Sequence, residues 1–213
     1  MSSGIKNVKK LSFKDFISGS SEYSSPRLKI LDFQRNFVWG RKQIVKFFDS
    51  IIENDSDFYI GNFVIQESEG SGGSNLIVDG QQRIVTISLF LITILHLTNE
   101  IKVQNEIKNL LFLTPLSKNP RLSFSRKGMN GVYKNILNNK ISNFASEDKL
   151  LKNVLTRFRA VKKILRGKDI QSLFEKIKKL QLITINCSST HDVATLYQGL
   201  NSTSKKLEPA ELI

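Results

Sequence analysis

The sequence predicts an α+β protein in which a small sheet with helices is followed by a mainly helical part. Two observations carry this prediction. Short runs of β-branched and aromatic residues, separated by turn-forming residues, occupy the first half of the 213-residue chain, and apolar residues spaced three and four apart dominate the second half. With 40% hydrophobic and 24% charged residues, the chain has the composition of a folded protein that builds one or two cores.

The first half is expected to hold the small sheet. In chain order, its predicted elements are a helix over 11–18, a strand over 28–31, an amphipathic helix over 42–54, and strands over 59–66 and 75–78. Ser12 is expected to cap the first helix and Gly19 to end it. The loop ESEGSGGS between the last two strands is typical of a connection between antiparallel neighbours.

The long apolar segment from Gln81 to Leu97 has two interpretations. A membrane span needs about 20 mostly apolar residues, whereas the uninterrupted part of this segment is shorter and carries hydroxyl side chains and a histidine. We therefore expect it to be the buried central helix of the first part.

The second half is predicted to be mostly helical. Helices are expected over 101–113, 128–139, 146–166, 169–180 and 191–200, with a strand over 182–187. A further helix begins near Pro209 and the sequence stops inside it, as is expected for one domain of a longer protein. We expect a division into residues 1–100 and residues 101–213.

The positive charge is concentrated in the second half. The net charge of +13 comes from 32 Lys and Arg against 19 Asp and Glu, and residues 1–100 hold 11 of each sign. On the predicted helix over 146–166, the basic residues opposite the apolar stripe are Lys149, Lys152, Arg159, Lys163 and Arg166. Such a face is expected to contact DNA, although lysine-rich helices are often only solvated surfaces.

Cysteine and histidine usage narrows the class of protein further. Cys187 is the single cysteine, which excludes an internal disulfide framework and fits a reducing compartment. The two histidines, His96 and His191, are far apart, so a His-ligated metal site is not expected. The N-terminal residues lack the apolar region of a signal peptide, and a cytoplasmic location is expected.

The sharpest local motif is the run VDGQQR at residues 78–83, where a predicted strand turns into a helix. The first backbone N–H groups of a helix lack intrahelical partners and favour anions. Gln81, Gln82, Arg83 and Thr86 add donors suited to phosphate, and Asp79 is expected to hold Mg²⁺ through water. The alternative is that Asp79 caps the helix and Arg83 pairs with a neighbouring acid.

A second motif, FQRNFVW at residues 33–39, precedes the helix over 42–54. Gln34, Arg35 and Trp39 could line a pocket in which the indole packs on a base or a guanidinium. The alternative is that the aromatic residues belong to the core and Arg35 to the surface.

Four sequence blocks then point to a known family. The runs DFQRNFVWGRKQIVKFFDSI, YIGNFVI, VDGQQRIVTISLFL and LYQGLNSTSKKLEPAELI follow one another between about residues 30 and 213. In this order they resemble the DGQQR domain at the N-terminus of GmrSD-type, modification-dependent restriction enzymes and related phage-defence proteins. That domain is distantly similar to the ParB/sulfiredoxin fold.

The resemblance implies a domain that binds and hydrolyses a nucleoside triphosphate and regulates DNA restriction. It implies that the signature holds the triphosphate and supplies the catalytic candidates. The pocket would be completed by four residues of the first block, Gln34, Arg35, Trp39 and Gln43. Gly61 would allow close approach of backbone. The signature residues are Asp79, Gly80, Gln81, Gln82 and Arg83, of which all but Gly80 are catalytic candidates. The implied partners are DNA, modified or not, and an HNH-type nuclease domain or subunit.

Two functional hypotheses from different classes therefore stand. The first is a nucleotide-dependent sensor of a phage-restriction system, with Mg²⁺ and a nucleoside triphosphate as cofactors. The second is a DNA-binding or protein-interaction module in which the DGQQR junction is only structural. A domain that itself cuts DNA is disfavoured, because no carboxylates or histidines stand at metal-ligand spacing. A homodimer is an open expectation.

Overall fold

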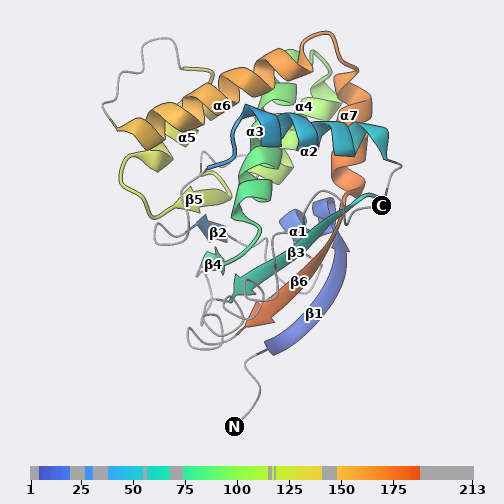
Figure 1. The fold of residues 1–213 in the computed structure, drawn as a ribbon, viewed down its shortest axis with the longest axis vertical. Coiled ribbons are helices and arrows are strands. Elements are labelled where there is room, and N and C mark those ends of the chain that lie inside the picture. The colour runs from blue at the N-terminus through green and yellow to red at the C-terminus, as the bar shows by residue number, and fades with distance from the viewer. Residues whose placement is uncertain are drawn as a thin grey trace.

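The structure is a computed structural model of the chain. It describes residues 5–19, 27–30, 38–54, 57–67, 74–114, 117, 119–140 and 148–187. These residues form one six-stranded sheet, with most of the helices gathered on one side of it (Figure 1). The α+β class predicted from the sequence is confirmed. The described residues contain no helix with the length and apolar character of a membrane span.

The sheet is mixed, with the strand order β1-β6-β3-β4-β2-β5. Its strands are β1 (Ile5–Ser12), β2 (Arg27–Ile30), β3 (Tyr59–Gln66), β4 (Ser74–Ile77), β5 (Leu122–Phe124) and β6 (Gln181–Cys187). The predicted strands 59–66 and 75–78 pair in antiparallel register, with Ile65 opposite Ile77, as the loop composition indicated. The other antiparallel pair is β1 with β6, and the remaining neighbours are parallel.

Two strands were not predicted. β1 lies at one edge of the sheet, and most of its side chains are exposed, so the alternation of apolar and polar residues that marks a half-buried strand is absent. Lysines on such an edge protect it from pairing with another chain. β5 has only three residues, too few for a periodic signal.

The helices agree with the predicted segments to within a few residues. They are α1 (Phe13–Ser18), α2 (Arg41–Glu53), α3 (Gln81–Leu97), α4 (Ile101–Leu111), α5 (Met129–Leu137), α6 (Lys149–Leu165) and α7 (Ile170–Lys179). Ser12 caps α1 as expected, because its hydroxyl accepts from the Asp15 N–H at 3.1 Å. The predicted helices over 191–200 and from Pro209 lie outside the described residues.

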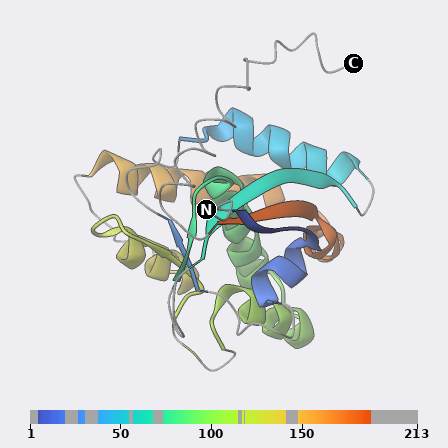
Figure 2. The same ribbon diagram turned by 90° about the horizontal axis from the view of Figure 1, so that it is seen from below.

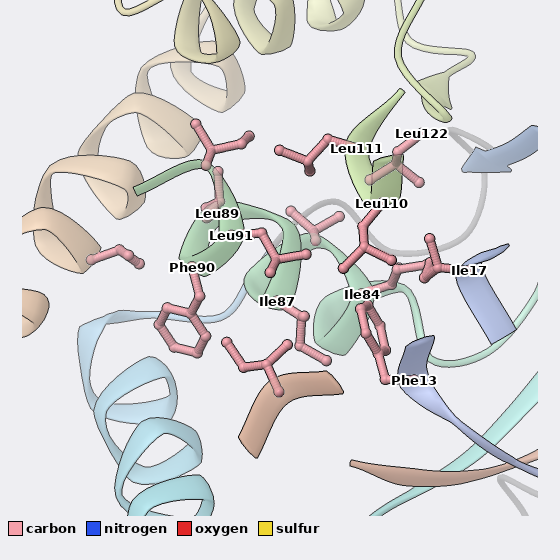
Figure 3. Packing of buried hydrophobic residues seen from close by; sticks show 14 of the residues in the cluster. Phe13, Ile17, Ile84, Ile87, Leu89, Phe90, Leu91, Leu110, Leu111 and Leu122 are labelled. Carbon is pink, nitrogen blue, oxygen red and sulfur yellow. The ribbon is translucent and has the colours of Figure 1, made fainter. Parts of the chain in front are cut away.

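Helix α3 is the centre of the core. Ile87, Leu89 and Phe90 are fully buried, and side chains from α1, α4 and β5 pack around the same helix (Figure 3). Seen from below, α3 runs between α4 on one side and α2 and α6 on the other (Figure 2). Full burial of each such side chain contributes about 1.5–3 kcal/mol, so α3 anchors the whole helical layer.

Both halves of the chain build the same sheet. β6 comes from the second half and lies between β1 and β3 of the first. One hydrophobic cluster also runs from Phe13 of α1 to Leu182 of β6. The expected division between residues 1–100 and 101–213 falls between α3 and α4 and stays a prediction, as does the likeness to ParB.

Candidate functional site

The VDGQQR motif forms the junction between β4 and α3, as predicted. Gly80 is the residue before the helix and has a left-handed conformation with φ of 92°. A Cβ at this position would lie 2.5 Å from the Phe63 ring, so both the backbone and the packing require glycine. The N-terminus of α3 therefore sits directly against β3.

The two glutamines of the motif bond to backbone on either side of the junction. Gln81 is buried, and its amide nitrogen donates to the Ile77 oxygen at 2.8 Å. The Gln82 amide oxygen accepts from the backbone N–H groups of Val38 and Trp39, at 2.9 and 3.1 Å. The signature thus ties β4 to α3 and ties the segment before α2 to the same helix.

Arg83 is bound to strand β3. Its terminal nitrogens donate to the backbone oxygens of Ile60 and Asn62, the latter at 2.7 Å, and the guanidinium carbon lies 4.9 Å from the centre of the Phe63 ring. Asp79 is 3.4 Å away, which matches the expected alternative in which Arg83 pairs with a neighbouring acid. Burial lowers the pKa of Arg83, and the Asp79 carboxylate opposes that shift.

Gly61 permits the approach of Arg83. A Cβ on Gly61 would lie 1.9 Å from an Arg83 nitrogen, and the backbone there has φ of 98°. The family resemblance implied that this glycine allows close approach of backbone. In the structure the group that approaches is the arginine of the signature.

Asp79 is more open to solvent than Arg83, with 46% of its side chain exposed compared with 20% for Arg83. It does not cap α3, because the helix begins without a side-chain cap. An accessible carboxylate, although paired here with Arg83, fits Mg²⁺ that keeps its waters and is held mainly by nucleotide phosphates. Thr86, by contrast, is fully buried, and its hydroxyl donates to the Gln82 backbone oxygen at 2.8 Å.

The first sequence block meets the junction through Trp39. The indole is half-buried against the core and lies edge-on to Phe47, with ring centres 5.3 Å apart. Gln43 closes the first turn of α2, because its amide oxygen accepts from the Gly40 N–H at 2.9 Å. The predicted pocket residues Gln34 and Arg35 lie outside the described residues.

Arg157 contributes to this region and was not predicted. Its Nε donates to the Trp39 backbone oxygen at 2.7 Å, so α6 reaches the segment that Gln82 also binds. On α6, Arg157 lies at the flank of the apolar stripe, next to buried Phe158. A cation at such a flank is no specific signal in the sequence, because its stem can lie along apolar surface while its charge reaches solvent.

The basic face of α6 has the orientation that the sequence predicted. The apolar stripe is buried, whereas the five basic residues opposite it are exposed: Lys149, Lys152, Arg159, Lys163 and Arg166. The last of these directly follows the end of α6 and is counted here with its basic face. The structure thus presents these cations to solvent together. Contact with DNA stays a prediction.

These features match a known domain. The family model of the GmrSD restriction endonuclease N-terminal domain covers residues 13–213. The chain belongs to this family. No curated protein sequence matches it.

Membership in the GmrSD N-terminal family explains why the four sequence blocks occur together in this chain and in this order. The match begins at α1 and includes the β4–α3 junction and the basic helix α6. The family makes the chain a component of a restriction system and implies a nuclease as partner.

In the part of the chain that the structure describes, no group of three or more His, Cys, Asp and Glu side chains could share a metal ion. The roles of the signature residues toward a nucleotide, and of Asp79 toward Mg²⁺, stay predictions.

Proposed function

We propose that this GmrSD N-terminal domain is a nucleotide-dependent sensor in a modification-dependent restriction system that acts against phage. A nucleoside triphosphate with Mg²⁺ binds beside the β4–α3 junction, DNA binds the basic face of α6, and both control an HNH-type nuclease. One observation supports this best: the signature, Trp39 and Gly61 meet at the N-terminus of α3. The Asp79 carboxylate at the same place stays accessible to solvent.

Within this proposal, the signature residues divide into two roles. Gln81, Gln82 and Arg83 shape the junction, because each donates to or accepts from backbone groups of neighbouring segments. Asp79 faces the ligand and would hold Mg²⁺ through water. If Arg83 also stabilises charge on the phosphates, and if Gln81 or Gln82 orients the attacking water, these bonds must be exchanged when the nucleotide binds.

Nucleotide turnover tests the catalytic form of the proposal. Phosphate release should be detectable for at least one nucleoside triphosphate with Mg²⁺, and Asp79→Ala and Arg83→Ala should each lower it at least tenfold, about 1.4 kcal/mol in the barrier. Asp57→Ala, which removes an exposed carboxylate outside the junction, is the matched control and should keep the wild-type rate. Equal release by the wild type and both junction variants, or release by none, contradicts catalysis here.

The DNA part of the proposal rests on α6. Exposed cations along one helix face can follow phosphates of a duplex, and such contacts make affinity depend steeply on salt. The buried stripe on the opposite side packs against the core that contains α3, so the cations stand together on the outer face of a packed helix.

A second function is favoured by one observation. Gln81, Gln82 and Arg83 already have protein partners, which suits a junction that is only structural and a domain that binds DNA or another protein. In that case the domain binds duplex DNA, but no nucleoside triphosphate raises its melting temperature.

A further inference from the structure

Trp39 is held from two sides by elements that belong to different parts of the proposed function. Its backbone N–H donates to Gln82 of the signature helix at 3.1 Å, and its backbone oxygen accepts from Arg157 of the basic helix at 2.7 Å. Hydrogen bonds from a charged group to a carbonyl are stronger than neutral ones. Residue 39 therefore cannot shift without changing a bond to α3 or to α6.

The Trp39 side chain strengthens the same link. Its ring packs edge-on against Phe47 of α2, and Phe47 stacks on Phe90 of α3, with ring centres 6.5 Å apart. Phe90 is fully buried in the core. The residue thus joins α2, α3 and α6 through its backbone and its ring together.

We propose that Arg157 is a positioning residue that connects the nucleic-acid face of α6 to the DGQQR junction through Trp39. This inference rests on the proposed function, because it names the route by which DNA and nucleotide influence each other. A shift of α6 towards bound phosphates moves the Arg157 guanidinium. The backbone of Trp39 follows the guanidinium, and the hydrogen bond from the Trp39 N–H to Gln82 transmits the change to the N-terminus of α3.

The chain offers a direct probe of this route, because Trp39 is its single tryptophan. The chain also has four tyrosines, so the emission is excited at the red edge of the absorption band, where only tryptophan absorbs, and then reports the surroundings of this residue alone. We would measure the emission while adding an unlabelled short duplex DNA, and measure affinity separately by the anisotropy of a labelled duplex.

Three variants separate the positioning role from simple charge loss. Arg157→Gln should bind the duplex yet lose most of the emission change seen in the wild type, and Arg157→Lys should retain part of it. Arg159→Gln is the matched control: it removes one exposed arginine of the same helix, so it should weaken binding several-fold but show the full emission change at saturating duplex. Far-ultraviolet circular dichroism checks that each variant is folded.

The outcomes distinguish this inference from the proposed function. A full emission change in folded Arg157→Gln at saturation overturns the role of Arg157, and so does a wild type that binds duplex without any emission change. A wild type that does not bind duplex at all contradicts the proposed DNA partner and the coupling with it. Loss in Arg157→Gln with partial rescue in Arg157→Lys supports the route, because a merely structural role would not separate affinity from emission.

Discussion

At the scale of single residues, the junction depends on the contact between the Arg83 side chain and Gly61 of β3. Arg83 binds two backbone oxygens of β3 and can do so because Gly61 has no side chain. Arg83 could be predicted as important from the VDGQQR motif, and Gly61 from the family resemblance of the block YIGNFVI. Their contact could not, because it joins positions that are 22 apart in the sequence and depends on how β3 lies against α3.

Gly61→Ala should destabilise the protein by about 2 kcal/mol or more. The new methyl group would overlap the Arg83 guanidinium, and the left-handed backbone at this position disfavours any side chain. Urea unfolding measures the change. Gly131→Ala is the control, since Gly131 lies in α5 with nothing near its absent Cβ, and it should stabilise the protein by up to about 1 kcal/mol. Equal free energies of unfolding in the two variants would refute the close approach.

Tyr133 should make stability sensitive to alkaline pH. Burial raises the pKa of its hydroxyl from 10.0 to about 12, with the Ser88 hydroxyl opposing the shift in part. The folded state holds this proton more tightly than the unfolded state does. The neutral Tyr133 hydroxyl therefore contributes its full share to the free energy of unfolding below pH 10, and this share, about 3 kcal/mol, is lost as the pH rises to about 12. Chemical unfolding between pH 9 and 12 should therefore show a smaller alkaline loss in Tyr133→Phe. The same loss in both proteins would exclude this group as the cause.

At the scale of elements, helices were predicted well and edge strands poorly. The stripe of α6 follows from its 3.6-residue apolar period, whereas the central helix α3 follows from a continuous apolar run, which is typical of a helix buried on all sides. β1 and β5 carry no such signal, since one is an exposed edge and the other has three residues. Arg157 escaped prediction because its partner, the Trp39 oxygen, is a backbone atom that leaves no trace in the side-chain pattern.

The basic face of α6 should bind duplex DNA through phosphate contacts. Replacing both Lys163 and Arg166 by glutamine should weaken the affinity and lower the slope of log affinity against log salt by about 2, because each phosphate contact contributes about 0.9. Anisotropy titrations of a labelled duplex at several salt concentrations measure both quantities.

A charge-matched control tests whether the location of the charge matters. Lys102 and Lys134 are exposed on α4 and α5, and replacing both by glutamine removes the same net charge. If this control lowers affinity and slope as much as the α6 variant does, net charge rather than the α6 face attracts the DNA.

At the scale of the whole molecule, the sheet is the feature that sequence patterns predicted least. The strand over 182–187 was expected, but its place between β1 and β3 follows from pairings across more than 100 residues. Local periodicity contains no information about such pairing. The site was predicted better, because a strand, a glycine and a helix in direct succession define a junction locally, whereas the partners of Gln82 and Arg83 depend on the tertiary fold.

The central claim is that the β4–α3 junction binds a nucleoside triphosphate. Its most direct test is the melting temperature of the wild type with each common ribonucleoside triphosphate and Mg²⁺, compared with Asp79→Asn and with the control Asp57→Asn. At a ligand concentration of about 100 times Kd, mass action adds about 2.7 kcal/mol, which should raise Tm by about 5 °C or more. The account predicts this rise in the wild type and in Asp57→Asn, with a much smaller rise in Asp79→Asn. An unchanged Tm with every nucleotide, or an equal rise in all three proteins, would contradict it.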